Sequence, residues 1–146
     1  MISTVIDNWH ANLRGQFPGG LDELLHDDCV FWSPVVFAGQ EGKELTKLYL
    51  GAAGNVFPGD KSEASDSSDA ESDKKSAFRY VKQVVDGNHA VLEFETMMGD
   101  VSVNGVDIIT CDEDGKIVEF KVMIRPLRAI NKVHEQMGQM LEKMQS

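Results

Sequence analysis

Asp107 is the residue whose type and surroundings best fit proton-transfer chemistry. Alternation along residues 100–111 places it on the same strand face as Ile109 and Cys111. Burial on such an apolar face disfavours the charged carboxylate and raises the pKa of the acid, and perturbed acids are typical of functional sites. Asp107 is therefore the candidate catalytic acid or base. The alternative is a structural role, in which its carboxylate accepts a hydrogen bond from a neighbouring backbone amide.

His10 is the second candidate for acid–base chemistry. It follows Trp9 in the first expected helix, and an imidazole titrates close to neutral pH. The alternative is an ordinary surface histidine. The remaining histidines and both cysteines are scattered without metal-ligand spacing: His26, His89, His134, Cys29 and Cys111. The sequence therefore predicts no metal site, no cofactor and two reduced thiols.

A set of large side chains is predicted to line a ligand pocket. Its apolar and aromatic members are Phe31, Trp32, Tyr49, Phe94 and Met123. Trp9 and Arg125 are predicted to orient the ligand through polar contacts. A wall of this kind, with few polar groups, suits an apolar or aromatic small molecule.

The elements that must position these residues follow from hydrophobic periodicity. Three- and four-residue steps predict a helix over residues 2–13, a short helical segment over 21–25, a helix over 41–53 that Gly54 breaks, and a long helix after Leu127. Residues 29–36 are rich in β-formers and predict a strand. Period-two segments predict four more strands over 78–85, 90–97, 100–111 and 117–124. We expect a turn at Met98 and Gly99 and a glycine bulge at Gly105 that bends the third of these strands.

Residues 58–76 form an acidic, serine-rich insertion without any aromatic or large aliphatic side chain. Such a segment cannot offset the entropy of ordering by apolar burial, so we expect a solvated loop. Two alternatives are phosphorylated serines and a calcium-binding loop over 60–71, although Ala64 and Ser65 stand where that motif uses an oxygen ligand and glycine. Residues 1–146 otherwise have the length of one domain.

Composition excludes several classes of partner. The 146 residues carry a formal net charge of -10, which opposes binding to a polyanion and argues against nucleic acid. No apolar run approaches the ~20 residues that a membrane span needs. Because the chain starts without a basic leader and long apolar stretch, we expect a cytoplasmic protein.

Local sequence then points to a family. Residues 24–34, LLHDDCVFWSP, resemble the first strand region of SnoaL-like proteins, which are members of the nuclear-transport-factor-two-like superfamily. Residues 103–107, VNGVD, and 114–117, DGKI, resemble a strand pair of these proteins, and residues 120–127, FKVMIRPL, resemble a closing strand of one bacterial subgroup. The resemblance covers nearly the whole chain outside 58–76.

The resemblance implies an α+β fold, namely a cone-like barrel of a curved, mostly antiparallel sheet wrapped around the N-terminal helices, with a C-terminal helix. It also implies a homodimer through the convex face of the sheet, and an enclosed pocket in which buried carboxylates do acid or base work. Asp107 lies eight residues before Gly115, the spacing at which ketosteroid isomerases carry a protonated acid. The expected activity is that of a cofactor-free isomerase, cyclase or hydratase.

Departures from the isomerase pattern leave the chemistry open. Ser33 stands where the isomerases carry their catalytic base, and Trp9 falls near the position of their helix tyrosine, so the sequence does not predict steroid isomerisation. Only Asp107 and Arg125 match part of the acid, arginine and acid trio of limonene-type epoxide hydrolases. The alternative function is a non-catalytic ligand carrier or a protein-interaction module.

Overall fold

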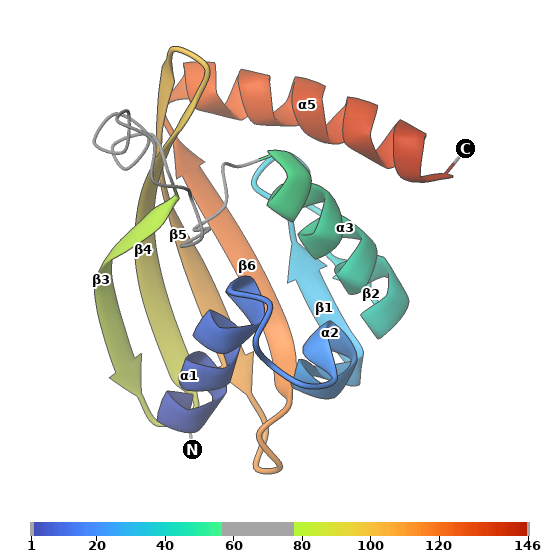
Figure 1. The fold of residues 1–146 in the computed structure, drawn as a ribbon, viewed down its shortest axis with the longest axis vertical. Coiled ribbons are helices and arrows are strands. Elements are labelled where there is room, and N and C mark those ends of the chain that lie inside the picture. The colour runs from blue at the N-terminus through green and yellow to red at the C-terminus, as the bar shows by residue number, and fades with distance from the viewer. Residues whose placement is uncertain (1, 57–77, 146) are drawn as a thin grey trace.

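The computed structural model of the chain describes residues 2–56 and 78–145, and within these ranges it contains four helices and six strands (Figure 1). The helices are α1 (Ile2–Leu13), α2 (Gly20–Leu24), α3 (Lys43–Val56) and α5 (Leu127–Gln145). The strands are β1 (Leu25–Trp32), β2 (Gln40–Glu41), β3 (Arg79–Asp86), β4 (His89–Met98), β5 (Val101–Cys111) and β6 (Ile117–Arg125). The predicted acidic insertion at 58–76, including the calcium-loop alternative at 60–71, lies outside the described residues.

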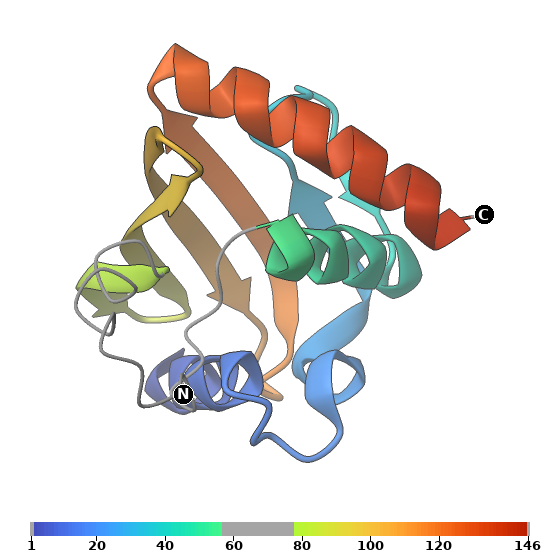
Figure 2. The same cartoon turned by 45° about the horizontal axis from the view of Figure 1, so that its top comes forward.

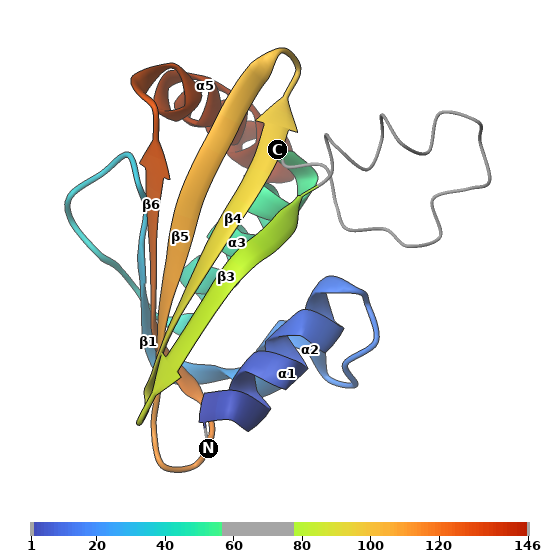
Figure 3. The same cartoon turned by 90° about the vertical axis from the view of Figure 1, so that its left-hand side faces the viewer.

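The six strands form one curved sheet in the order β2-β1-β6-β5-β4-β3. β1 runs parallel to β6, and every other neighbouring pair is antiparallel. All four helices lie on one side of this sheet: α1 covers one end, and α5 crosses the other end beside α3 (Figures 1 and 2). The predicted α+β cone is therefore confirmed, although the sheet stays open between β2 and β3 and does not close into a barrel (Figure 3).

Alternation along the long strands separates two faces of the sheet. In β5 every second residue from Val101 to Cys111 is buried, and the same face of β4 and β6 carries Leu92, Phe94 and Phe120. We call this helix-covered side the inner face and the opposite side the outer face. The alternation predicted for these strands is confirmed.

The inner face builds two hydrophobic clusters. The first packs α1 against the sheet around Ile6, Leu92 and Phe120, and includes residues of β1. The second lies beneath α5 around Phe94 and Val133. Tyr80 and Val122 pack against both clusters, so the two side chains mark the boundary between them.

Gly105 does not form the predicted bulge. The β5 ladder runs through it without interruption, with Phe94 opposite on β4 and Ile124 opposite on β6. Glycine is needed for a different reason: a Cβ at this position would lie 2.5 Å from Cζ of Phe94 and 2.7 Å from the carbonyl oxygen of Met123. The register shifts lie elsewhere, between Leu25 and Val30, between Tyr80 and Lys82, and between Thr110 and Cys111.

Three further boundaries can be compared with the predictions. The turn before β5 is confirmed, and Gly99 takes the left-handed backbone with φ 63 that this turn requires. The α3 helix continues through Gly54 to Val56, because one glycine in a helix weakens it without ending it. β1 starts at Leu25 and ends at Trp32, where the Ser33 hydroxyl accepts a hydrogen bond from the N–H of Val35 and turns the chain.

No helix among the described residues is both long enough and apolar enough to span a membrane.

Candidate acid–base site

Asp107 lies at the middle of β5 on the inner face and is only 5% exposed. Its cross-strand neighbours are Leu92 on β4 and Val122 on β6. Leu92 belongs to the first cluster and Val122 packs against both. The carboxyl group therefore stands where the two hydrophobic clusters meet, with an apolar side chain on either flank.

A hydrogen-bond chain links Asp107 to β3 and α1. The hydroxyl of Tyr80 donates to Oδ2 of Asp107 at 2.5 Å. The indole N–H of Trp9 in turn donates to the Tyr80 oxygen at 2.9 Å. Tyr80 is 27 residues from Asp107 in the sequence, and Trp9 is 71 residues from Tyr80. These hydrogen bonds therefore exist only in the folded protein.

Burial sets the protonation behaviour of this pair. Desolvation raises the pKa of Asp107 to about 7, and the hydrogen bond from Tyr80 opposes that rise. The pKa of Tyr80 lies well above its ordinary value, first because the phenol is buried and then because it faces Asp107. Asp107 can therefore gain or lose a proton near neutral pH, whereas Tyr80 stays a hydrogen-bond donor.

Aromatic rings surround the chain of hydrogen bonds. The Trp9 ring lies 4.9 Å from that of Phe120, and the rings of Phe78 and Tyr80 meet edge to face at 5.1 Å. Phe78 also stacks on Phe94 at 4.8 Å. These contacts hold the two hydrogen-bonding rings in place and keep the site largely apolar.

Several predicted site residues meet on this inner face. Phe31 and Phe94 are buried in the two clusters, and Tyr49 of α3 stacks on Phe31 at 5.5 Å. Trp9 lies in the chain that ends at Asp107, although its partner is Tyr80. His10 meets Tyr80 edge to face at 5.3 Å, while its Nε2 bonds the side-chain oxygen of Gln83.

Trp32, Met123 and Arg125 lie on the outer face, so the structure does not bring them to the predicted pocket. The indole of Trp32 donates to Glu119; the Met123 side chain is 51% exposed; and Arg125 donates to Asn104. Successive side chains of a strand point to opposite faces of the sheet. Trp32 follows the inner-face residue Phe31, and Met123 and Arg125 lie three and five residues after the inner-face residue Phe120, so all three point outward.

Tyr80 is the functional candidate that the sequence analysis did not single out. Its hydroxyl contacts Asp107 across the sheet because β3 pairs with β4 and β4 with β5. The sequence contained one signal: Phe78 and Tyr80 are two residues apart in the predicted strand 78–85 and so lie on the same face of it. In the structure Tyr80 pairs with Phe94 of the next strand, which is a predicted pocket residue. Without the strand register, that parity could not be connected to Asp107.

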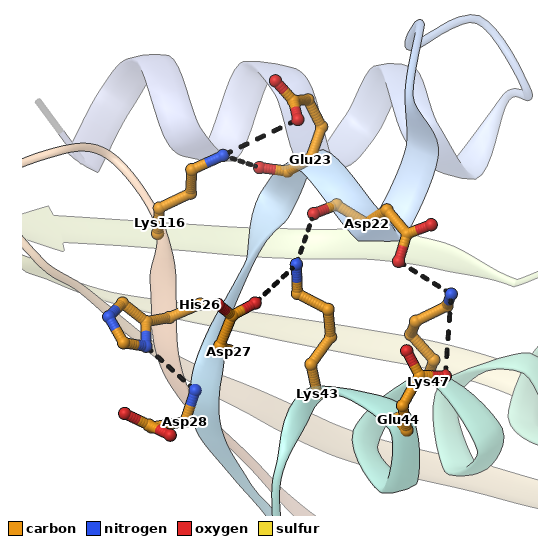
Figure 4. Close-up of polar contacts among 9 residues, drawn as sticks. All are labelled: Asp22, Glu23, His26, Asp27, Asp28, Lys43, Glu44, Lys47 and Lys116. Carbon is orange, nitrogen blue, oxygen red and sulfur yellow. Dashed lines mark hydrogen bonds and ion pairs between the residues drawn. The ribbon is translucent and has the colours of Figure 1, made fainter.

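Polar residues elsewhere serve to join elements. Lys47 Nζ pairs with Asp22 at 2.7 Å and lowers the pKa of that carboxyl, and Lys43 Nζ donates to the Asp22 carbonyl oxygen. Lys116 donates to the carbonyl oxygen of Glu23 (Figure 4). These exposed contacts tie α2 to α3 and to the turn before β6, and exposed pairs of this kind add little stability.

Two hollows among residues 2–56 and 78–145 lie away from Asp107. A hollow of about 400 Å³ is lined by Arg79, Glu95 and Arg125, among others. A shallower depression of about 660 Å³ is lined by Asp27, Lys43 and the start of α3. Neither is lined by Asp107. Within these ranges, no three side chains of His, Cys, Asp or Glu are grouped so that they could hold a metal ion.

The open curved sheet, the helices on its inner face and the buried acid define an α+β protein of the nuclear-transport-factor-two-like type. The family model described as the SnoaL-like domain matches residues 6–120. The chain therefore belongs to the SnoaL-like domain family, and the predicted family membership is confirmed. No curated protein matches the sequence significantly.

Solved structures support the same placement. A steroid delta-isomerase from Pseudomonas aeruginosa is 30% identical, with a TM-score of 0.80 over 98% of this chain and 93% of that chain. A cystatin-like-fold protein from Silicibacter pomeroyi is 26% identical, with a TM-score of 0.73 over 95% of this chain and 85% of that one. A de novo designed protein with a curved β-sheet is similar in fold alone, at 15% identity and a TM-score of 0.63 over 92% of this chain and 94% of the design. Because a designed sheet has the same shape, function must be argued from the site.

Proposed function

We propose that this protein is a cofactor-free isomerase or cyclase that moves a proton on an apolar or aromatic small molecule, with Asp107 as the acid or base. The observation that carries the proposal is the buried Asp107 carboxyl group in contact with the Tyr80 hydroxyl, with a pKa of about 7. A general acid or base works best when its pKa lies near the operating pH. The SnoaL-like family and the similarity to a protein described as a steroid delta-isomerase support the same class of reaction.

The reaction needs no bound group beyond the side chains themselves. The ionised Asp107 carboxylate takes a proton from a carbon next to a carbonyl group and returns it at a second carbon of the same molecule. Tyr80 keeps its own proton throughout, because its pKa lies far above neutral. His10, beside the Tyr80 ring, is the group that we propose for proton exchange nearer the solvent.

The ligand would lie between the two hydrophobic clusters, beside Asp107. The rings of Phe31, Tyr49 and Phe94 support this location because all three belong to or pack against those clusters. An aromatic lining favours a ligand with a ring or a hydrocarbon body.

The assembly that we propose is a homodimer in the cytoplasm. Three exposed apolar side chains of the outer face support a second copy there: Val84 at 53%, Val91 at 37% and Met123 at 51% exposure. Apolar residues grouped in this way on a sheet are stabilised by a partner surface. The free thiols of Cys29 and Cys111, both buried, support a reducing compartment.

A non-catalytic ligand carrier is the second candidate function. Asp107 is the one buried carboxyl group among the described residues, and the Trp9 indole at the end of its hydrogen-bond chain cannot exchange protons. A carrier would use the same carboxyl group to bind a polar atom of its ligand without turning it over.

The test is a turnover assay with β,γ-unsaturated ketones, one steroidal and one monocyclic, followed by the absorbance of the conjugated product. We expect Asp107→Asn to lose roughly 10²–10⁴-fold in rate. Asp100→Asn is the matched control, because this carboxylate is 89% exposed in the β4–β5 turn. Equal rates for wild type and Asp107→Asn would contradict the proposal, and ligand binding without turnover would favour the carrier.

A further inference from the structure

The three groups of the hydrogen-bond chain differ in what they can donate and accept. An indole N–H only donates, a phenol has one proton to donate, and an ionised carboxylate only accepts. Trp9 therefore has to donate to the Tyr80 oxygen, at 2.9 Å. The single proton of Tyr80 is then free to point at Oδ2 of Asp107, at 2.5 Å.

We propose that Trp9 is a positioning residue, which holds and polarises the Tyr80 hydroxyl on Oδ2 of Asp107 and so leaves Oδ1 as the atom that exchanges the proton. The inference rests on the proposed function, because it assigns a working atom to the same acid. It goes further by giving a role to a residue that does not contact Asp107.

The same geometry disfavours a proton on Oδ2. Such a proton would point at the Tyr80 oxygen and would displace the Tyr80 proton from its acceptor. Among the described residues the Tyr80 hydroxyl bonds only Trp9, which is a donor, and Asp107. A proton on Oδ1 leaves the bond from Tyr80 to Oδ2 in place and can be passed to or taken from a ligand.

Oδ1 is the oxygen of Asp107 that is left for a ligand. It accepts no hydrogen bond from residues 2–56 or 78–145, whereas Oδ2 accepts the proton of the Tyr80 hydroxyl. A ligand placed beside the acid would therefore interact with Oδ1.

The groups packed around Asp107 indicate that its titration depends mainly on the hydrogen bonds of Tyr80 and Trp9. Leu92 on β4 and Val122 on β6 are apolar, and β3 contributes Tyr80. His10 of α1 contacts the Tyr80 ring and bonds Gln83, so Tyr80 lies between His10 and Asp107. The titratable group of α3 on this side is Tyr49, which stacks on Phe31.

Removing the indole donor is the direct test. In Trp9→Phe the Tyr80 hydroxyl loses the donor that polarises it, so its hydrogen bond to Oδ2 weakens and the ionised carboxylate is stabilised less. We expect the pKa of Asp107 to rise by roughly 0.5–1 unit, measured by carboxyl-detected NMR titration of the full chain. Trp32→Phe is the matched control, because it also removes an indole donor, in this case the one that bonds the Glu119 carboxylate on the outer face. It should leave the pKa of Asp107 unchanged.

A second measurement needs no variant and remains informative if Trp9→Phe does not fold. In the wild type, the indole N–H resonance of Trp9 should shift with the same midpoint as Asp107, because the two are joined through Tyr80. The Trp32 resonance should not show that midpoint. Two results would overturn the inference while the proposed function stands. One is an unchanged Asp107 pKa in folded Trp9→Phe; the other is a Trp9 indole resonance whose chemical shift does not change at the midpoint of the Asp107 titration. A wild-type Asp107 that titrates near 3.8 would instead remove the proposed function itself.

Discussion

Replacing Asp107 with asparagine should make the protein more stable at neutral pH. The folded protein holds the carboxyl group at a pKa of about 7, against a value of 3.8 for an ordinary aspartate. Between these values the folded state keeps a proton that the unfolded state has released. The contribution of Asp107 to stability is therefore fully present below the lower pKa and is lost as the pH rises to about 7.

The size of the loss follows from the two pKa values. Each unit of difference corresponds to ~1.36 kcal/mol, so the ionised carboxylate lowers the free energy of unfolding by about 4 kcal/mol at neutral pH. That is a large part of the 5–15 kcal/mol typical of a domain. Asparagine has nearly the same shape, never ionises, and keeps an oxygen that can accept the Tyr80 hydrogen bond. Its buried amide N–H groups add a cost that does not change with pH.

Urea denaturation of wild type and Asp107→Asn at a series of pH values isolates this effect. Taking the difference between the two proteins cancels the titration of all other groups. The stability of the variant relative to wild type should rise by about 2 kcal/mol between pH 5 and pH 7, and level off about one pH unit above the pKa of Asp107. A difference that does not vary with pH, or that changes in the opposite direction, would refute the argument that Asp107 is desolvated.

Three further substitutions test other parts of the structure. Gly105→Ala should lower the free energy of unfolding by roughly 1–3 kcal/mol, because the added Cβ meets the Phe94 ring and a backbone oxygen; unchanged stability in urea would contradict the close packing. Tyr80→Phe should raise the pKa of Asp107 by roughly 1–2 units, since it removes the hydrogen bond that lowers that pKa; a fall in the NMR titration midpoint would contradict the site. Met123→Lys should shift the sedimentation coefficient towards that of a monomer, and a dimer as tight as the wild type would show that the outer face is not the contact.

The fold was predictable because local patterns agree with the tertiary structure. The helical period placed α1 within the observed bounds Ile2–Leu13, and period-two alternation placed β3 to β6 within a residue or two of theirs. The same alternation put Asp107 on a buried face, and its predicted rise in pKa has the physical cause expected, namely desolvation.

The site was less predictable because it depends on which strands pair and in what register. Trp32, Met123 and Arg125 were predicted at the pocket from their side-chain types, and all three lie on the outer face. Parity along one strand does not specify which face is covered until the neighbouring elements are known. Gly105 looked like a bulge because glycine permits one, whereas its actual constraint is the Phe94 ring on the next strand. The Tyr80 contact to Asp107 spans two strand pairings, and no local pattern encodes it.

The pKa of Asp107 in the wild-type protein, measured by carboxyl-detected NMR titration, is the most direct test of the proposed acid–base site. We expect a midpoint of about 7, which would mark a desolvated acid that can exchange protons at neutral pH. A midpoint at or below 3.8, the ordinary value for aspartate, would contradict it, and Asp107 would then be a structural acceptor for the Tyr80 hydroxyl.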